Sequence, residues 1–129
     1  MSAPSKRLFI VGAMALLSSC SPPVIDIAVE KVDGRMLLRL SQDWGLIFSN
    51  REIPCVREVG LHEPETYDRE KAAWLIEAKG DVQCLDLASV VVGEVPKGWQ
   101  EVVRLTAVSG RTYAIRAHGI GWGETNVRF

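Results

Sequence analysis

Most of the chain after residue 23 consists of short runs in which apolar and polar residues alternate, separated by residues that form turns. Alternation with a period of two is typical of strands that bury one face. The Asp33-Gly34 pair lies between the first two runs, and both residue types tolerate the positive φ of a tight hairpin. The pattern predicts an all-β fold, a small antiparallel β-sandwich of about seven to nine strands. The runs occupy residues 24–29, 36–40, 46–48, 53–61, 85–92, 99–105, 113–117 and 126–129.

The segment from Glu65 to Lys79 departs from this pattern. Pro64 precedes it, Gly80 follows it and most of its residues are good helix formers, which favours a capped helix. Its second half, however, alternates as a strand would, with Ala72, Trp74, Ile76 and Ala78 on one face. We therefore expect a polar loop or single helical turn over 64–71 and a strand over 72–79, with a helix as the alternative.

The first twenty residues have a pattern of their own. Lys6 and Arg7 form a basic segment, and residues 8–17 (LFIVGAMALL) are ten uncharged residues. This run is too short for a helix that crosses a bilayer but suits the apolar region of a secretory signal peptide. We expect residues 1–19 to form a cleaved N-terminal signal helix.

The signal segment ends in Leu17-Ser18-Ser19-Cys20. This sequence resembles the lipobox of bacterial lipoproteins, in which an apolar residue and two small residues precede the cysteine that receives lipid. The resemblance implies cleavage before Cys20, acylation of the Cys20 thiol, a short tether over residues 20–23 and a single domain over 24–129. It also implies a lipid-anchored protein of the bacterial cell envelope, and Ser21 implies the outer membrane, facing the periplasm. An ordinary signal peptide with a cysteine near its cleavage site is the alternative.

The cysteine count agrees with this location. Three cysteines leave one without a partner in an exported protein. Lipidation of Cys20 would leave Cys55 and Cys84 as one pair in an oxidising compartment, where disulfides persist. We expect these two to form a disulfide. Two free buried thiols or zinc ligation are the alternatives, and the lack of C-x-x-C spacing disfavours zinc.

The segment from Leu105 to Tyr113 resembles the corner before the penultimate strand of immunoglobulin-like and fibronectin type III sandwiches. In those domains a leucine, a turn with glycine and a tyrosine connect a strand end to the other sheet. The spacing here is longer than usual, and the chain has no Cys-Trp-Cys arrangement of the true immunoglobulin kind. The resemblance implies an immunoglobulin-like architecture and no particular activity, because this fold hosts many functions.

Composition and charge exclude two classes of protein. The 129 residues include 15 Lys and Arg against 16 Asp and Glu, and 47% of the residues are hydrophobic. A chain this apolar and this close to neutral is not disordered. It also lacks the basic excess of a nucleic-acid-binding protein. Removal of residues 1–19 would leave 110 residues and shift the net charge from −1 to −3, because Lys6 and Arg7 would be lost.

One group of side chains could bind a metal or exchange protons: His62, Glu63, Glu65 and Asp68. Their spacing is not that of zinc ligands and His118 is distant in sequence, so a solvated loop is the simpler interpretation. The glycines of the segment 119–123 (GIGWG) lack the spacing of a phosphate-binding loop and indicate a tight turn or bulge. The chain also has no G-x-S-x-G motif. We expect neither an enzyme nor a cofactor.

Four tryptophans are a high number for a chain of this size, and they are Trp44, Trp74, Trp99 and Trp122. At least two should lie in the core, because a small sandwich needs large side chains between its sheets. Trp99 and Trp122 lie in turn-rich segments. We therefore expect these two to form an exposed binding surface.

These features favour a non-catalytic lipoprotein, held at the lipid membrane through acylated Cys20, that binds an envelope protein or supports an assembly and binds no nucleic acid. The alternative is a periplasmic inhibitor or immunity protein against lysozyme-like enzymes. Ser109-Gly110 and His118-Gly119 each faintly resemble the loop that small disulfide-bonded β lipoproteins of that kind insert. A third hypothesis is a hydrolase or metal-dependent enzyme that uses His62.

Overall fold

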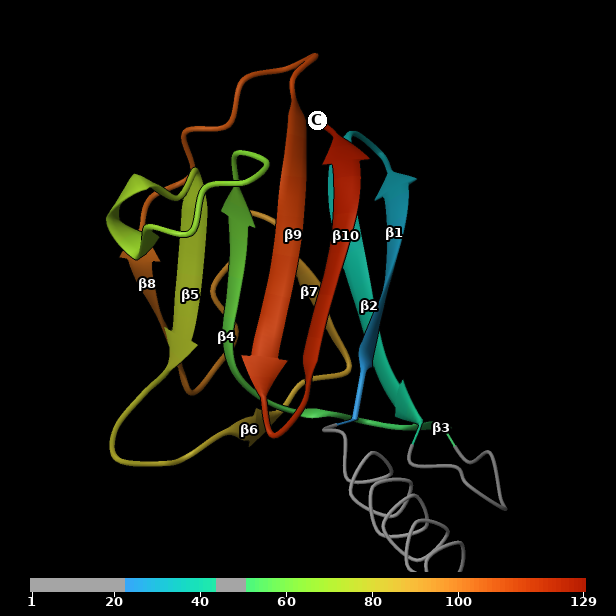
Figure 1. The fold of residues 1–129 in the computed structure, drawn as a ribbon, viewed down its shortest axis with the longest axis vertical. Coiled ribbons are helices and arrows are strands. Elements are labelled where there is room, and N and C mark those ends of the chain that lie inside the picture. Colours follow the sequence, from blue (N-terminus) through green and yellow to red (C-terminus); the bar gives the residue numbers. More distant parts are fainter. Residues whose placement is uncertain (1–22, 44–50) are drawn as a thin grey trace, which may run out of the picture.

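The structure is a computed structural model that describes residues 23–43 and 51–129. Over these residues the chain forms two antiparallel sheets that pack face to face (Figure 1). The expected signal helix, Cys20, Trp44 and the run at 46–48 lie outside the described residues. Within them, no helix has the length and apolar character needed to span a bilayer.

The first sheet contains four strands: β1 (Ile25–Val32), β2 (Arg35–Asp43), β3 (Arg51–Glu52) and β7 (Ser89–Val91). β2 pairs with β1 along one edge and with β3 and β7 along the other. Asp33 and Gly34 connect β1 to β2 with φ angles of 50° and 75°, which confirms the predicted hairpin.

The second sheet contains six strands: β4 (Cys55–His62), β5 (Trp74–Ala78), β6 (Leu85–Asp86), β8 (Trp99–Val103), β9 (Thr112–Gly119) and β10 (Trp122–Arg128). Its order is β10-β9-β4-β5-β8, and β6 pairs with the start of β4. β1 lies beside β10, where an isolated bridge joins Val24 to Trp122. The two sheets therefore meet at the start of the described chain.

The all-β sandwich is confirmed, but the strand number is ten over the described residues rather than seven to nine. The run at 85–92 is the main reason for the difference. It was expected as one strand, and it forms two, because β6 pairs with β4 in one sheet and β7 pairs with β2 in the other. Leu87, between them, is buried where the chain crosses from sheet to sheet. Two-residue strands such as β3 and β6 are too short to produce an alternating pattern.

The order of the paired strands is that of an immunoglobulin-like sandwich. β1, β2 and β7 take the places of strands A, B and E, and β10, β9, β4 and β5 take those of G, F, C and C′. β8 is an addition at the free edge of β5. In the segment that resembles the corner before the penultimate strand, the Tyr113 hydroxyl accepts a hydrogen bond of 2.8 Å from the Val108 backbone N–H, which is the kind of bond a tyrosine corner makes.

The segment at 64–79 folds as the favoured prediction states. A single turn of 3-10 helix (Arg69–Lys71) is capped by the Asp68 carboxylate, which accepts a hydrogen bond from the Glu70 N–H. β5 follows, with Trp74, Ile76 and Ala78 facing the core. Alternating burial outweighs the helix propensity of this segment because these three side chains lie between the sheets.

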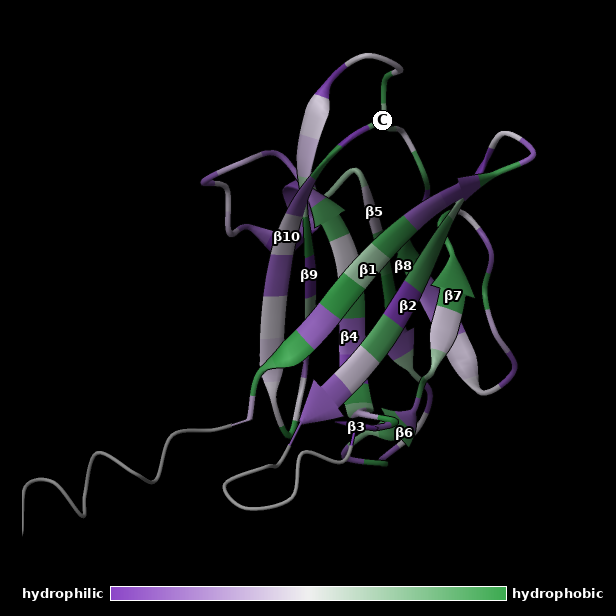
Figure 2. Ribbon diagram, turned by 90° about the vertical axis from the view of Figure 1, so that its right-hand side faces the viewer, coloured by the Kyte–Doolittle hydropathy of each residue, from purple (hydrophilic) through white to green (hydrophobic). Residues whose placement is uncertain are grey.

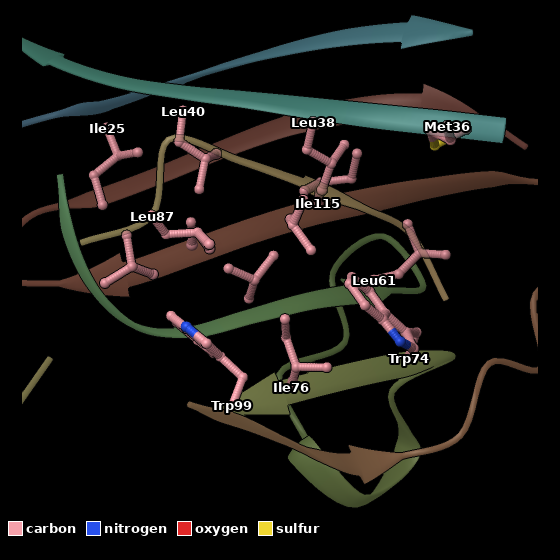
Figure 3. Close-up of a cluster of buried hydrophobic side chains, with 14 of the residues drawn as sticks. Ile25, Met36, Leu38, Leu40, Leu61, Trp74, Ile76, Leu87, Trp99 and Ile115 are labelled. Carbon is pink, nitrogen blue, oxygen red and sulfur yellow. The ribbon is translucent and has the colours of Figure 1, made fainter. Parts of the chain in front are cut away.

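The core fills the space between the two sheets (Figure 3). Hydrophobic and hydrophilic residues alternate along β1 and β2 (Figure 2). β4 interrupts its alternation with a bulge between Val56 and Glu58, so that Val56 and Val59 both face inward. Large side chains of this core with less than 2% exposure come from both sheets: Ile25, Leu38, Val56, Val59, Leu61, Trp74, Ile76 and Ile115.

Candidate functional site

The outer face of the six-stranded sheet carries a row of polar side chains that crosses four strands. Residues paired directly across neighbouring strands point to the same side of a sheet. Trp122 pairs with His118, His118 with Glu58, Glu58 with Glu77, and Glu77 with Gln100. We call His118, Glu58, Glu77 and Gln100 the polar row. Trp122 extends it at the β10 edge.

Arg69 connects the two carboxylates of the polar row. Its Nη2 lies 3.0 Å from Glu58 Oε2 and 3.0 Å from Glu77 Oε2. Gln100 Nε2 donates a hydrogen bond of 2.7 Å to Glu77 Oε1, and His118 Nε2 lies 3.6 Å from Glu58 Oε2. The 3-10 turn that carries Arg69 is thereby held over the sheet. The two facing carboxylates would repel each other without the guanidinium.

The charges in this row shift two pKa values. Burial by itself would raise the pKa of Glu58, but the contact with His118 and the charge of Arg69 together outweigh it and leave the pKa below its ordinary value. The charge of Glu58 raises the pKa of Arg69. Glu58 is therefore a carboxylate under all conditions near neutral pH. Its oxygens are engaged by Arg69 and His118, which suits an ion-pair network better than proton transfer.

Arg116, on β9, holds the loop over residues 63–68 against the outer face of the six-stranded sheet. Its guanidinium donates a hydrogen bond to the Thr66 carbonyl, and its Cζ lies 4.3 Å from the centroid of the Tyr67 ring. The Arg116 side chain is buried, and its Nε lies 3.4 Å from Glu124 Oε2. Tyr67 is 74% exposed, so one face of its ring covers Arg116 while the rest of the side chain faces outward. The loop thus presents an aromatic side chain in a fixed position.

The His62 group is dispersed. His62 is buried and its imidazole lies over Gly60, where an added Cβ would clash with Nε2. Burial and the charge of Arg116 lower the pKa of His62. Glu63 lies 3.7 Å from Arg111, and Asp68 caps the 3-10 turn. Over residues 23–43 and 51–129, no three His, Cys, Asp or Glu side chains gather closely enough to hold a metal ion.

The structure separates the two tryptophans expected at one surface. Trp99 is only 3% exposed and packs in the core, so its predicted exposure is wrong. The Pro96-Lys97-Gly98 turn ends at Trp99, whose N–H donates to the Pro96 carbonyl, and β8 begins there with the side chain facing inward. Trp122 is 52% exposed, as predicted. The two side chains do not form a shared surface.

The predicted disulfide is present. Cys55 and Cys84 are bonded, with their Cα atoms 5.3 Å apart. The bond ties the start of β4 to the connection between β5 and β6. Cys20, the expected lipidation site, lies outside the described residues.

No pattern in the sequence indicates the polar row directly. Its members are separated by up to 60 positions and come together only through strand pairing. The one local signal is Glu58, which stands with Arg57 as the two charged residues of a mostly apolar run over residues 53–61. Arg69 and Arg116 could not be assigned to it, because their partners lie on other elements.

Comparison with known proteins adds no assignment: no family model, no curated protein and no solved structure matches the chain.

Proposed function

We propose that the protein is a non-catalytic lipoprotein of the bacterial cell envelope, anchored in the outer membrane through Cys20 and facing the periplasm. Its proposed role is to bind another envelope protein through the outer face of the six-stranded sheet. The anchor and the binding face rest on separate observations and have separate tests.

The cysteine arrangement supports the anchor. The disulfide occupies Cys55 and Cys84, so the cysteine of the lipobox-like sequence is the remaining thiol. A disulfide also suits an exported protein. Each buried CH₂ of an acyl chain stabilises membrane binding by about 0.8 kcal/mol, and two or more chains give a stable anchor.

One observation carries the proposal of a binding face: Tyr67 is exposed on a loop that Arg69 and Arg116 fix over the sheet. Aromatic and arginine side chains dominate the binding energy of many protein interfaces. A side chain that is already ordered loses little conformational entropy when a partner covers it. The neighbouring charges would give the interface its specificity.

The anchor is tested by expressing the full chain in a bacterium with lipoprotein processing and separating the extract between detergent and water. The parent should enter the detergent phase and carry acyl chains on Cys20 by mass spectrometry. Cys20→Ser should leave it in the aqueous phase or in an uncleaved form, whereas Ser21→Ala should behave as the parent. An unmodified Cys20 in the parent would contradict the anchor.

The binding face is tested by cross-linking and affinity capture from envelope extracts. The parent should capture a partner that uses this face. Tyr67→Ala should reduce the amount captured about tenfold or more, as expected for a hot-spot aromatic. Val95→Ala, an exposed position in the connection between β7 and β8, is the matched control and should leave capture unchanged. Equal capture by all three proteins would rule out this face.

The inhibitor alternative has a narrower structural basis. Ser109-Gly110 precedes β9 and His118-Gly119 ends it, so the two motifs lie at opposite ends of an eight-residue strand. An inhibitory loop could therefore use one motif but not both. Lysis assays with several muramidases, with and without the purified protein, test this function; unchanged lysis in all of them excludes it for those enzymes.

A further inference from the structure

The end of the sandwich where the described chain begins carries four large apolar side chains that are each more than half exposed. They are Val24, Ile53, Ile120 and Trp122, which we call the apolar end. They come from three places: the residue before β1, the connection between β3 and β4, and the β9–β10 hairpin, where Ile120 lies in the turn and Trp122 begins β10. Figure 1 shows all three places at the same end of the molecule.

Close backbone packing fixes the segment that carries Ile120 and Trp122. At Gly119 an added Cβ would clash with the Cys55 carbonyl, and at Gly121 it would clash with the Pro23 carbonyl. The N–H groups of Ile120 and Trp122 donate to the same two carbonyls, at 3.3 and 3.2 Å. The turn thus lies flat against the neighbouring chain. Ile120 and Trp122 remain exposed next to Pro23.

The covalent chain brings this end close to Cys20. Pro23 is the third residue after Cys20, and three fully extended residue steps span at most about 11 Å. The headgroup layer on each side of a bilayer is about 5–8 Å thick. If Cys20 carries acyl chains within the bilayer, as proposed above, Pro23 and its neighbours must lie at the headgroups or just outside them.

We propose that the apolar end docks on the lipid surface, with Trp122 and Ile120 at the boundary between headgroups and acyl chains. This inference rests on the proposed lipid anchor. Tryptophan and aliphatic side chains favour that boundary. Arg51, which lines the same surface hollow as Val24 and Trp122, is paired with Asp26 at 3.0 Å, so the contact depends on apolar burial rather than on anionic lipid. A zwitterionic surface is therefore sufficient.

Docking in this way would orient the domain. The strands run away from the apolar end, and the Asp33-Gly34 hairpin lies at the opposite end of the sandwich (Figure 1). The loop that carries Tyr67 follows the far end of β4. The proposed partner-binding residue would then be held clear of the membrane.

Fluorescence quenching tests the docking with the protein as the cell makes it. The chain is purified from membranes, its Cys20 adduct is read by mass spectrometry, and it is placed in phosphatidylcholine vesicles with brominated acyl chains. Trp122 should lose fluorescence relative to vesicles without bromine. Trp122→Phe should remove the part of this loss that Trp122 contributes, whereas Trp74 and Trp99 are buried in the core. Trp44 is present in both proteins, so its contribution cancels.

Further variants separate docking from other effects. Ile120→Ser should weaken the quenching of Trp122, whereas Val95→Ser, an exposed position in the connection between β7 and β8, should leave it unchanged. Circular dichroism checks that each variant is folded. Acylated Cys20 without quenching of Trp122 would overturn the docking and leave the anchor intact. An unmodified Cys20 would overturn the anchor and, with it, the docking.

Discussion

At the scale of single residues, Arg69 determines whether two facing carboxylates are compatible with the folded sheet. Glu58 and Glu77 are paired across β4 and β5, and Arg69 contacts both. Arg69 itself is half exposed, so water and salt weaken its attraction to each carboxylate. Arg69 therefore contributes little free energy, but its position allows it to contact both carboxylates.

Replacing Arg69 should expose the repulsion between these carboxylates. Arg69→Met is expected to lower the free energy of unfolding by about 0.5–1 kcal/mol at low salt and by less at high salt. Adding Glu77→Gln should recover most of the loss. Urea unfolding at two salt concentrations measures both effects. Arg35→Met, which removes the exposed pair with Glu94, is the control and should have almost no effect.

His62 predicts a dependence of stability on pH. Its pKa is lowered in the folded protein by burial and by Arg116, so the unfolded chain binds a proton more readily. The stabilisation that neutral His62 contributes is fully present above its pKa in the unfolded chain, about 6.5. It is lost as the pH falls toward the lower pKa of His62 in the folded protein. The lowered pKa of Glu58 adds a further loss at more acidic pH.

The measurement is the urea midpoint between pH 7.5 and pH 5.5. The parent should become less stable over this interval. His62→Gln should reduce the slope, because no imidazole remains to be protonated at this position. An identical slope in the two proteins would mean that His62 does not contribute to it.

At the scale of elements, the contact between β1 and β10 depends on Gly123. A Cβ at this position would clash with the Ile25 backbone carbonyl, and a backbone atom cannot rotate away as a side chain can. This contact joins the two sheets beside the Val24–Trp122 bridge. The edge of the sandwich at the apolar end thus depends on a position without a side chain.

Gly123→Ala should therefore destabilise the protein by about 1–3 kcal/mol, the usual cost of overpacking. It should also speed amide hydrogen exchange at the start of β1 and in β10. Gly80→Ala is the control: its added Cβ meets nothing within 4 Å, although φ is +77°. Gly80→Ala can lower the overall stability through backbone strain. Hydrogen exchange in β1 should then change only as much as the overall stability does.

At the scale of the whole molecule, the disulfide constrains a small domain. It closes a loop with a sequence separation of 29 residues, for which the chain-entropy estimate is about 3–4 kcal/mol. The double variant Cys55→Ser, Cys84→Ser should lose stability of this size in urea unfolding. Reduction of the parent should produce a similar loss, and the variant should not respond to reductant. A variant as stable as the oxidised parent would contradict this role.

Much of the architecture could be predicted because local patterns specify it. Alternation in β2 and β5, the Asp33-Gly34 turn and the pairing of Cys55 with Cys84 all follow from residues close in sequence or from simple counting. Trp99 was misplaced because a neighbouring turn says little about where the next side chain points. The division of residues 85–92 into two strands is not visible in the sequence, because the run is mostly apolar throughout and no residue in it marks the change of sheet.

The sequence by itself determined the period of burial, the turns, the cysteine inventory and the signal-like beginning of the chain, since each depends on neighbouring residues or on composition. Only the tertiary structure decided which side chains share a surface. Glu58, Glu77 and Arg69 became partners because strand pairing and a folded-back loop brought them together. Trp122 stayed exposed while Trp99 was buried, because exposure depends on what the rest of the chain covers.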